Sequence, residues 1–442
     1  MALYETDVEA DLLRSAVADL RLERLEPATV RRHAVPGTWY LATQLMLHPI
    51  PLDPVPRIIT DAGLPVAAVM YDVIPERYPD QYQARPTARA QVRLRGMLAR
   101  TLDTLLAISA FAAETAAQEL RFPRHRIEVI GAGVEQQFVP ATADPWPRVR
   151  ALLSDDGRRV VLMVSGTDSR KNTQRMLDAW GLVPEHIRAA HRLVVVGAVD
   201  DTLRLQWQQW ARAAGAGSDV SFTGGVTDEE MVALHQLATL AVMPSTEEGF
   251  GLPVLEAAAC GTPVIASSVS SLPEILAEPA AEFDPFDIRS IAAAVERALI
   301  DPEHRAVLQR AAGRAVERWT WAHTGAATIA ALEAIGPRHT RTLRQPVRRI
   351  ALEGRFDDSE TGRANAALAD DIAALPDAPE VHVLVDHATL ATPTYAGPRR
   401  FPVRALGRFV HPSQFDRVIV LDAGSDRVAL LESIASREAE AS

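Results

Sequence analysis

One passage, between Leu240 and Ala266, constrains the fold of this 442-residue chain more than any other. It begins with a short apolar run, continues through a glycine loop at 249–251 and ends in a second apolar, β-branched run. Pro253 suits the first turn of a helix, where its missing N–H costs nothing, and Gly261 suits the end of that helix. The passage therefore predicts strand, glycine loop, short helix and strand, as in a parallel sheet with crossover helices.

Similar apolar runs recur along the chain and alternate with helical stretches, so the predicted fold class is α/β. The predicted strands are 39–47, 66–71, 105–109, 127–130, 160–164, 193–197, 220–223, 240–243 and 264–266. A polar, proline-containing link at 144–147 separates the first four strands from the others. The link marks the end of a first part, at residues 1–150. We expect two further parts, at residues 151–338 and 345–442.

Composition excludes several classes of protein. The net charge of −11 and the lack of a basic tract argue against a nucleic-acid partner. The single cysteine, Cys260, excludes an internal disulfide framework and a cysteine-based zinc site, and we interpret it as a small buried residue. The sequence has no apolar stretch long enough to span a membrane and no signal-peptide pattern, which predicts a cytoplasmic protein.

A basic stretch interleaved with apolar residues gives two interpretations of the region 89–100. It contains Arg89, Arg93, Arg95 and Arg100. The stretch is either a solvated helix face or a peripheral contact with the inner face of the membrane.

The glycine loop at 249–251 predicts a ligand site. Glycines let the backbone approach a ligand closely, and the free N–H groups at the start of a helix favour phosphate or sugar oxygens. Glu248 precedes the helix and could accept hydrogen bonds from sugar hydroxyls, while Glu256, on the helix, could reach a ribose diol. Two surface acids are the alternative interpretation, and the surrounding loop and helix signals count against it.

The sequence Glu248-Gly-Phe-Gly-Leu-Pro-Val-Leu-Glu256 resembles the E-x7-E motif of retaining GT-B glycosyltransferases, specifically of glycosyltransferase family 4. Further segments in the family's order extend the resemblance from about Gly37 to Ile335. The resemblance implies two Rossmann-like lobes that face each other across a cleft. The C-terminal lobe would hold the donor nucleotide, and the N-terminal lobe would help to hold the acceptor.

The resemblance also implies roles for individual residues of the donor lobe. Arg170 and Lys171 would neutralise the diphosphate, because stabilising a departing negative charge is usually the largest catalytic contribution. Glu248 would position the sugar and Glu256 the ribose. The remaining donor-binding candidates are Gly166, Gly225, Val226, Gly249, Phe250, Gly251 and Leu252. Two cations beside the diphosphate make a metal unnecessary, so we expect no cofactor beyond the donor itself.

The N-terminal part departs from the family pattern. Tyr71-Asp72-Val-Ile-Pro resembles the family's His-Asp-Leu-Ile-Pro, but tyrosine replaces the histidine, so a role that needs an imidazole does not carry over. Asp72 is either a catalytic residue that meets an acceptor hydroxyl or a turn-capping residue. Ser165 stands where relatives often have arginine, and Ala132 replaces the usual asparagine or proline. The segment 107–111 resembles the family's Ser-x-Phe segment.

The two ends of the chain also differ from the family pattern. The residues from Ala10 to Thr29 predict a helix, whereas a GT-B N-terminal lobe opens with a strand and a glycine loop. The tail at 349–386 resembles that missing β-α-β opening. The tail either completes the N-terminal lobe in permuted order or begins a second glycosyltransferase module. We favour the second module, because 415–421 and 39–47 resemble the same strand of the family pattern.

The predicted function is transfer of a hexose from a nucleoside diphosphate to an acceptor hydroxyl with retention, in bacterial surface polysaccharide assembly. GDP-mannose is the favoured donor, and a glycan or a lipid-linked molecule is the expected acceptor. The alternative is a donor-binding subunit without turnover, whose missing unit a partner glycosyltransferase chain would supply. A sugar-nucleotide epimerase of GT-B fold is less favoured, because its acid and base residues do not assemble from this sequence.

Overall fold

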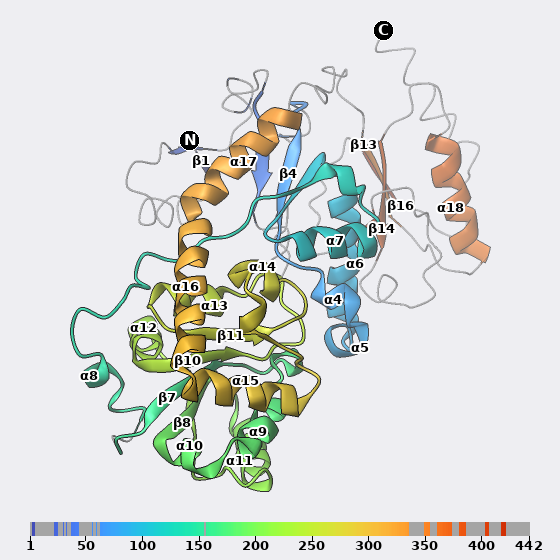
Figure 1. Cartoon of the computed structure of the whole chain (residues 1–442). Helices are drawn as coiled ribbons and strands as arrows, with labels where there is room; N and C mark the ends of the chain where they lie inside the picture. The colour runs from blue at the N-terminus through green and yellow to red at the C-terminus, as the bar shows by residue number, and fades with distance from the viewer. Residues whose placement is uncertain are drawn as a thin grey trace. The chain divides into compact units, whose positions relative to one another are not determined.

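The computed structural model describes two long stretches, 62–153 and 156–335. It also describes shorter pieces at 2–4, 22–24, 30, 32, 37–43, 55, 59, 349–353, 360–373, 380–385, 403–405 and 417–420. The chain divides into two compact units (Figure 1). Unit 1 comprises Met1–Leu106, Ala116–Glu128 and Ala330–Ser442, and unit 2 comprises Ala107–Thr115 and Val129–Ile329.

Unit 2 is built on a six-stranded parallel sheet with the strand order β12-β11-β10-β7-β8-β9. The strands are β7 (Arg159–Val164), β8 (His191–Val196), β9 (Val220–Gly224), β10 (Ala238–Met243), β11 (Val264–Ser267) and β12 (Glu282–Phe283). The chain builds outward from β7 in one direction and then, from β10, in the other. In such doubly wound sheets ligands bind at the carboxyl ends of the strands where the order reverses, here between β7 and β10.

The central strands β7 and β8 of the unit 2 sheet are buried on both faces, which explains why they are largely apolar runs. Along β7, Val161 and Met163 belong to one buried cluster, while Val160 and Leu162 belong to another. Strand β8 alternates in the same way. Because successive side chains of a strand point to opposite faces, each apolar run serves two cores.

Helices cover this sheet (Figure 1). They are α8 (Trp146–Val149), α9 (Thr173–Leu182), α10 (Glu185–Ala190), α11 (Asp201–Ala213), α12 (Asp228–Leu237), α13 (Leu252–Ala259), α14 (Leu272–Leu276), α15 (Ile288–Ile300) and α16 (Pro302–Arg318). Helix α17 (Trp321–Ile335) follows α16 and runs past the end of unit 2. Helix α12 begins with a capping box, in which Thr227 and Glu230 satisfy each other's backbone N–H groups. Helix α13 has Pro253 in its first turn and ends just before Gly261, as the sequence predicts.

Trp319 joins several parts of unit 2 at the end of α16. Its indole N–H donates to the carbonyl of Ile275 at 3.2 Å, and its ring meets the Phe250 ring edge to face at 5.3 Å. Gly131 and Gly133 pack nearby: a Cβ on Gly131 would stand 2.7 Å from the Trp319 ring, and a Cβ on Gly133 would stand 2.2 Å from the first backbone nitrogen of α17. Close packing therefore requires glycine at both positions.

Unit 1 contains most of a four-stranded sheet with the order β3-β4-β5-β6. The elements of this region are β3 (Tyr40–Ala42), β4 (Val66–Met70), α4 (Ile74–Arg77), α5 (Pro79–Tyr82), α6 (Pro86–Arg100), β5 (Thr104–Ala107), α7 (Ala110–Glu119) and β6 (Ile127–Val129). On α6, Arg95 is buried in an ion pair with Glu76, and the Arg100 guanidinium donates to the carbonyl of Leu120 at 2.8 Å. Both interpretations of the basic stretch, a solvated helix face and a membrane contact, place its arginines on the outside of the helix. Arg95 and Arg100 make internal contacts instead, so neither interpretation holds for these two residues.

The tail forms a further parallel sheet with the order β15-β14-β13-β16. Its strands are β13 (Arg349–Glu353), β14 (Glu380–Val385), β15 (Val403–Ala405) and β16 (Arg417–Val420), and α18 (Glu360–Ala373) follows β13. Numbered along the chain, this order is 3-2-1-4, which repeats the first four positions of the unit 2 sheet.

The α/β prediction is confirmed, and one predicted element is wrong. Leu22–Arg24 lies within the predicted helix 10–29 but forms β2, which pairs in parallel with β1 (Ala2–Tyr4). Intrinsic helix preference is a weak signal that pairing with another segment overrides. The rest of that predicted helix lies outside the described residues.

Candidate active site

The loops that follow β7 and β10 are tied together at the switch point of the unit 2 sheet. The backbone N–H of Thr246 donates to the carbonyl of Arg170 at 2.8 Å. The buried amide of Asn172 donates to the carbonyls of Pro244, at 3.0 Å, and Pro285, at 2.8 Å. Asn172 adopts a left-handed backbone conformation with φ 61°, which asparagine tolerates better than most residues. The two loops therefore form one surface where the fold favours a ligand.

Glu248 stands between two cations on this surface. Its carboxylate oxygens lie 2.7 Å from the Lys171 ammonium and 3.1 Å from the Arg170 guanidinium. Glu248 is only 7% exposed, and a carboxylate so far removed from water needs such partners. The structure thus brings together three predicted site residues from two loops that lie far apart in the sequence.

Asp168 holds the guanidinium of Arg170 in place, a role that the sequence does not predict. One carboxylate oxygen of Asp168 accepts from Arg170 Nε at 2.8 Å, and the other accepts from the Arg170 backbone N–H at 3.1 Å. Arg170 also donates to the carbonyl of Glu247 at 2.8 Å. A planar guanidinium with several fixed partners is pre-organised for a phosphate. An aspartate two residues before the arginine is the only sequence signal for this contact.

The glycine loop is anchored by Phe250 and shaped by Gly251. Phe250 is buried against Trp319, so its side chain serves the core. Gly251 has φ +114°, and a Cβ there would stand 2.5 Å from Leu272 Cδ2. Glycine is therefore needed at this position for both backbone conformation and space. Leu252, the next predicted donor residue, is 39% exposed at the start of α13.

The remaining glycine candidates, Gly166 and Gly225, follow β7 and β9, and the loop after β8 lies between them. The backbone N–H of Ser165 donates to Val196 O at 2.7 Å, and that of Gly197 donates to Gly224 O at 3.1 Å. A Cβ on Gly166 would meet no atom within 4 Å. Packing therefore does not require glycine at 166. The predicted residues Gly225 and Val226 follow β9 on the last of these loops.

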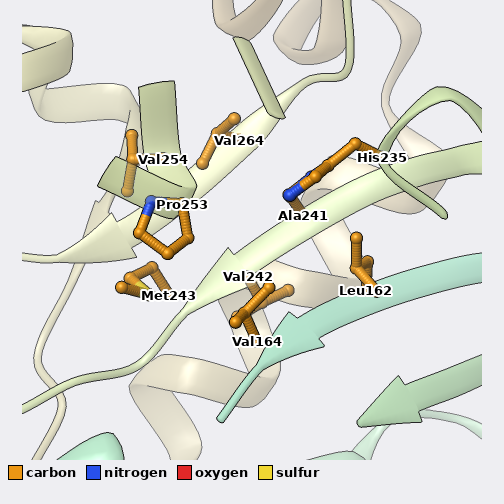
Figure 2. Close-up of a pocket in the computed structure, with 9 residues that line it drawn as sticks. All are labelled: Leu162, Val164, His235, Ala241, Val242, Met243, Pro253, Val254 and Val264. Atoms are coloured by element: carbon orange, nitrogen blue, oxygen red, sulfur yellow. The ribbon is translucent and has the colours of Figure 1, made fainter. Parts of the chain in front are cut away.

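Glu256 makes different contacts from Glu248. Its carboxylate lies 3.5 Å from Nε2 of His235, a buried histidine at the end of α12. His235 lines a small cavity between β10 and α13 (Figure 2). The other lining residues are Leu162, Val164, Ala241, Val242, Met243, Pro253, Val254 and Val264. With about 10 Å³ of space, the cavity has room for roughly one water and none for a nucleotide.

Asp72 and Tyr71 belong to unit 1. A carboxylate oxygen of Asp72 accepts from the backbone N–H of Ile74 at 3.0 Å, which is the turn-capping arrangement that the sequence offers as one interpretation. Partial burial raises the pKa of the Tyr71 phenol above its ordinary value. The catalytic role of Asp72 stays a prediction.

Cys260 has the character of a buried structural residue. It is 6% exposed, and burial, together with the nearby negative charge of Glu256, raises the pKa of its thiol to about 12. The thiolate is the nucleophilic form of cysteine, and at neutral pH it is scarcely populated at such a pKa. Cys260 is therefore unsuited to nucleophilic catalysis.

The described residues contain neither a metal-binding cluster nor a membrane-spanning helix. Within this part of the chain, no group of three or more His, Cys, Asp and Glu side chains could hold a metal ion. No helix among the same residues is long and apolar enough to cross a membrane.

Sequence comparison supports the resemblance drawn from the motifs. Residues 147–314 match the family described as Glycosyl transferases group 1. The chain is 29% identical over 279 residues to the serotype-specific mannosyltransferase WbdA of Escherichia coli, covering 62% of this chain and 33% of that protein. It is 28% identical over 234 residues to the O-antigen chain mannosyltransferase B of Escherichia coli, covering 52% of this chain and 60% of that protein. The match thus spans only about a third of the length of WbdA.

Structural comparison supports the fold. HepE of Anabaena, solved in complex with UDP and glucose, superposes with a TM-score of 0.56 at 18% identity, covering 74% of this chain and 89% of that one. The doubly wound sheet, the site at its switch point and these matches identify residues 147–314 as a glycosyl transferases group 1 domain, in a chain with the GT-B glycosyltransferase fold.

Proposed function

We propose that this chain is a retaining glycosyltransferase of family 4 that transfers a hexose from a nucleoside diphosphate to a hydroxyl of a glycan or lipid-linked acceptor. The observation that carries the proposal is Glu248, held between Arg170 and Lys171 at the switch point of the unit 2 sheet. A carboxylate for sugar hydroxyls and two cations for a diphosphate are the groups that a nucleotide sugar requires.

The proposed reaction breaks the bond between the anomeric carbon and the diphosphate oxygen. The acceptor oxygen forms its bond to that carbon on the same face of the sugar, and the acceptor proton passes to the departing diphosphate. The protein then needs no nucleophile. Arg170 and Lys171 stabilise the charge that develops on the leaving group, while the N–H groups at the start of α13 provide further donors.

Mannose is the proposed sugar, and surface polysaccharide assembly is the proposed setting. Two of the relatives are mannosyltransferases by name, and one of these is named for the O-antigen chain. GDP-mannose, a nucleoside diphosphate that carries this sugar, is therefore the proposed donor. We further propose that the reaction takes place in the cytoplasm and needs no metal, because the two cations can carry the charge of the leaving group.

A donor-binding subunit without turnover is the second candidate. It is favoured by Tyr71 in the place of the family's histidine and by Ser165 in the place of a frequent arginine. The Ser165 hydroxyl lies 2.6 Å from the Thr173 hydroxyl, so this position supplies no third cation to the diphosphate. The two candidates share a donor site and differ only in turnover.

Release of nucleoside diphosphate from a panel of UDP, GDP and dTDP sugars tests the proposal. We expect slow hydrolysis of one donor by the wild-type chain, faster release when an acceptor glycan is added, and a loss of about 10² in rate in Glu248→Ala. Near-normal turnover by Glu248→Ala would remove Glu248 from the site. Tight donor binding without release, with every acceptor offered, would favour the binding-subunit candidate.

A further inference from the structure

An aromatic side chain stands exposed on the loop that follows β12. Among the aromatic residues that the structure describes, Phe286 is the most exposed, at 58%. It lies on the short loop 284–287 between β12 and α15. Single apolar side chains are common on protein surfaces, so exposure alone does not make a site. The surroundings of Phe286 distinguish it from other exposed residues.

Hydrogen bonds on both sides of Phe286 hold this loop. The Phe286 backbone N–H donates to the Asp284 carboxylate at 2.8 Å, and the Asp284 backbone N–H donates to the Ser290 hydroxyl at 3.0 Å. Asp287, the next residue, caps α15 by accepting from the backbone N–H of Arg289 at 2.8 Å. The ring is therefore carried by a fixed backbone, and little conformational entropy is lost when a ligand packs on it.

The side chain of Asn172 connects this loop to the loops of the candidate site. Asn172 lies on the loop after β7, and its buried amide donates to the carbonyls of Pro244 and Pro285. Pro244 belongs to the loop that leads to Glu248, and Pro285 directly precedes Phe286. One amide thus joins the loops after β7, β10 and β12 at the carboxyl edge of the sheet.

Arg175 lies beside the Phe286 ring. Its guanidinium carbon is 5.9 Å from the ring centroid, within the range of a cation–π contact. Arg175 also donates from Nη1 to the side-chain oxygen of Asn172 at 3.0 Å. Arg175, Asp284 and Asp287 are all exposed. The neighbours of the ring therefore offer a hydrogen-bond donor and two acceptors.

This combination of groups matches a neutral sugar. A pyranose has C–H groups that pack on an aromatic face, and hydroxyls at its rim that bind polar and charged side chains. The Arg175 guanidinium can donate to such hydroxyls, and carboxylates can accept from them. An anionic ligand fits less well, because Asp284 and Asp287 flank Phe286 in the chain.

The strand order indicates which sugar comes to this loop. Arg170 and Lys171 lie on the loop after β7 and Glu248 on the loop after β10, and β11 and β12 follow in the same direction. A donor whose diphosphate binds the cations and whose sugar meets Glu248 leaves the β12 side of this edge for the acceptor. Neighbouring strands are about 4.8 Å apart, so β12 lies roughly 10 Å beyond β10, a distance that a short glycan spans.

We propose that Phe286 and Arg175 form a binding site for a hexose of the acceptor glycan. The proposal deepens the proposed function and rests on it, since it takes the acceptor to be a glycan. The Phe286 ring packs against the C–H face of the sugar, and Arg175 donates to its hydroxyls. The site favours acceptors that present a second sugar ring beyond the one that receives the transferred hexose.

Binding of trisaccharides of mannose, glucose or galactose to the full chain, measured by ligand-detected NMR, tests this proposal. We expect the wild type to bind at least one of these probes. Phe286→Ala should weaken that binding about fivefold, the order expected when a partly covered aromatic side chain is lost. Phe286→Tyr keeps the ring and should bind within about twofold of the wild type. Both variants should keep the wild-type affinity for nucleoside diphosphate, measured by calorimetry.

Ile300→Ala is the matched control. Ile300 lies at the far end of α15 and is similarly exposed, at 55%, so its removal should leave trisaccharide binding unchanged. Wild-type affinity in a folded Phe286→Ala variant would overturn the proposal, as would a wild type that binds none of the probes. An equal loss of nucleoside diphosphate affinity in Phe286→Ala would also overturn it, because the ring would then serve the donor. Since these measurements need no turnover, failure to turn over any nucleotide sugar would reject the proposed function and leave this result standing.

Discussion

At the scale of single residues, Glu248 determines the charge that a donor meets. Without a ligand, its carboxylate is paired with both Arg170 and Lys171. A diphosphate that binds these cations must share them with Glu248 or displace it. The carboxylate therefore opposes the binding of the diphosphate, while its proposed contact with the sugar favours the reaction.

Replacing Glu248 by glutamine should separate these two effects. Glu248→Gln removes the negative charge and keeps the shape, so we expect nucleoside diphosphate to bind several-fold more tightly, on the scale of a weakened charge pair. Turnover should fall by about 10². Calorimetry and product release measure the two quantities. Weaker binding of nucleoside diphosphate by Glu248→Gln would contradict the assignment of the two cations to the diphosphate.

The sequence predicted Glu248, Arg170 and Lys171 but not the hydrogen bonds that Asp168 makes to Arg170 and that Ser109 makes to Gly249. The three residues stand in motifs whose spacing is local, so a linear pattern reveals them. Asp168 and Ser109 act through hydrogen bonds whose value depends on three-dimensional geometry. In the case of Ser109 the partner lies 140 positions further along the chain. No periodicity or spacing predicts a contact of that kind.

At the scale of elements, the turn at Gly131–Gly133 and the end of α16 need each other. A Cβ on Gly133 would stand 2.2 Å from the backbone nitrogen of Trp321 and 2.7 Å from the backbone carbon of Thr320. Backbone atoms cannot move aside as a flexible side chain can. The glycine is thus required by the approach of two segments that are far apart in the sequence.

Alanine at two glycines should have opposite effects on stability. Gly133→Ala should lower the free energy of unfolding by about 1–3 kcal/mol, the usual cost of overpacking. Gly313→Ala is the matched control, because Gly313 lies within α16 and a Cβ there would meet no atom within 4 Å. It should raise stability by about 0.4–1 kcal/mol. Chemical denaturation measures both, and an unchanged stability in Gly133→Ala would contradict the packing described.

Elements with strong local patterns could be predicted, and those that depend on pairing could not. Strands β7 and β10 are long apolar runs buried on two faces, and the sequence predicts both. Strand β12 has only two residues, Glu282–Phe283, and exists through its pairing with β11. The segment that forms β2 was predicted as helix, because its composition gives no sign of the parallel pairing with β1 that makes it a strand.

At the scale of the whole molecule, the two sheet orders bear on the role of the tail. The strands of the tail already have the order 3-2-1-4, and β3 stands at the edge of another sheet next to β4. If the tail completed the N-terminal lobe, β16 and β3 would occupy the same position of the family pattern. We therefore propose that the tail is a second module and does not complete the N-terminal lobe.

Deletion of residues 341–442 tests this view. We expect the shortened chain to keep its affinity for nucleoside diphosphate within about twofold, because Arg170, Lys171 and Glu248 all lie in unit 2. Thermal unfolding should keep the transition of unit 2 and also that of residues 1–106 and 116–128, which belong to unit 1 together with the tail. Loss of the transition of these unit 1 residues would show instead that the tail completes the first lobe.

The pH dependence of stability should reflect two buried histidines. Burial lowers the pKa values of His191 and His304 below the ordinary value of 6.5. Below about pH 6.5 the unfolded chain therefore binds protons that the folded chain does not, and the free energy of unfolding falls as the pH falls. Each histidine contributes at most about 1.4 kcal/mol per pH unit. Denaturation between pH 7.5 and 5.5 should show a smaller loss in His304→Gln, and an equal loss would contradict this account.

The most direct test of the proposed donor site is the affinity for nucleoside diphosphate relative to nucleoside monophosphate, measured by calorimetry with UDP, GDP and their monophosphates. The wild-type chain should prefer one diphosphate by about tenfold or more over its monophosphate, because the proposed site places two cations at the terminal phosphate. A Lys171→Met variant should lose most of that preference and keep its affinity for the monophosphate. Equal preferences in the wild type and Lys171→Met would show that the diphosphate does not bind at Arg170, Lys171 and Glu248.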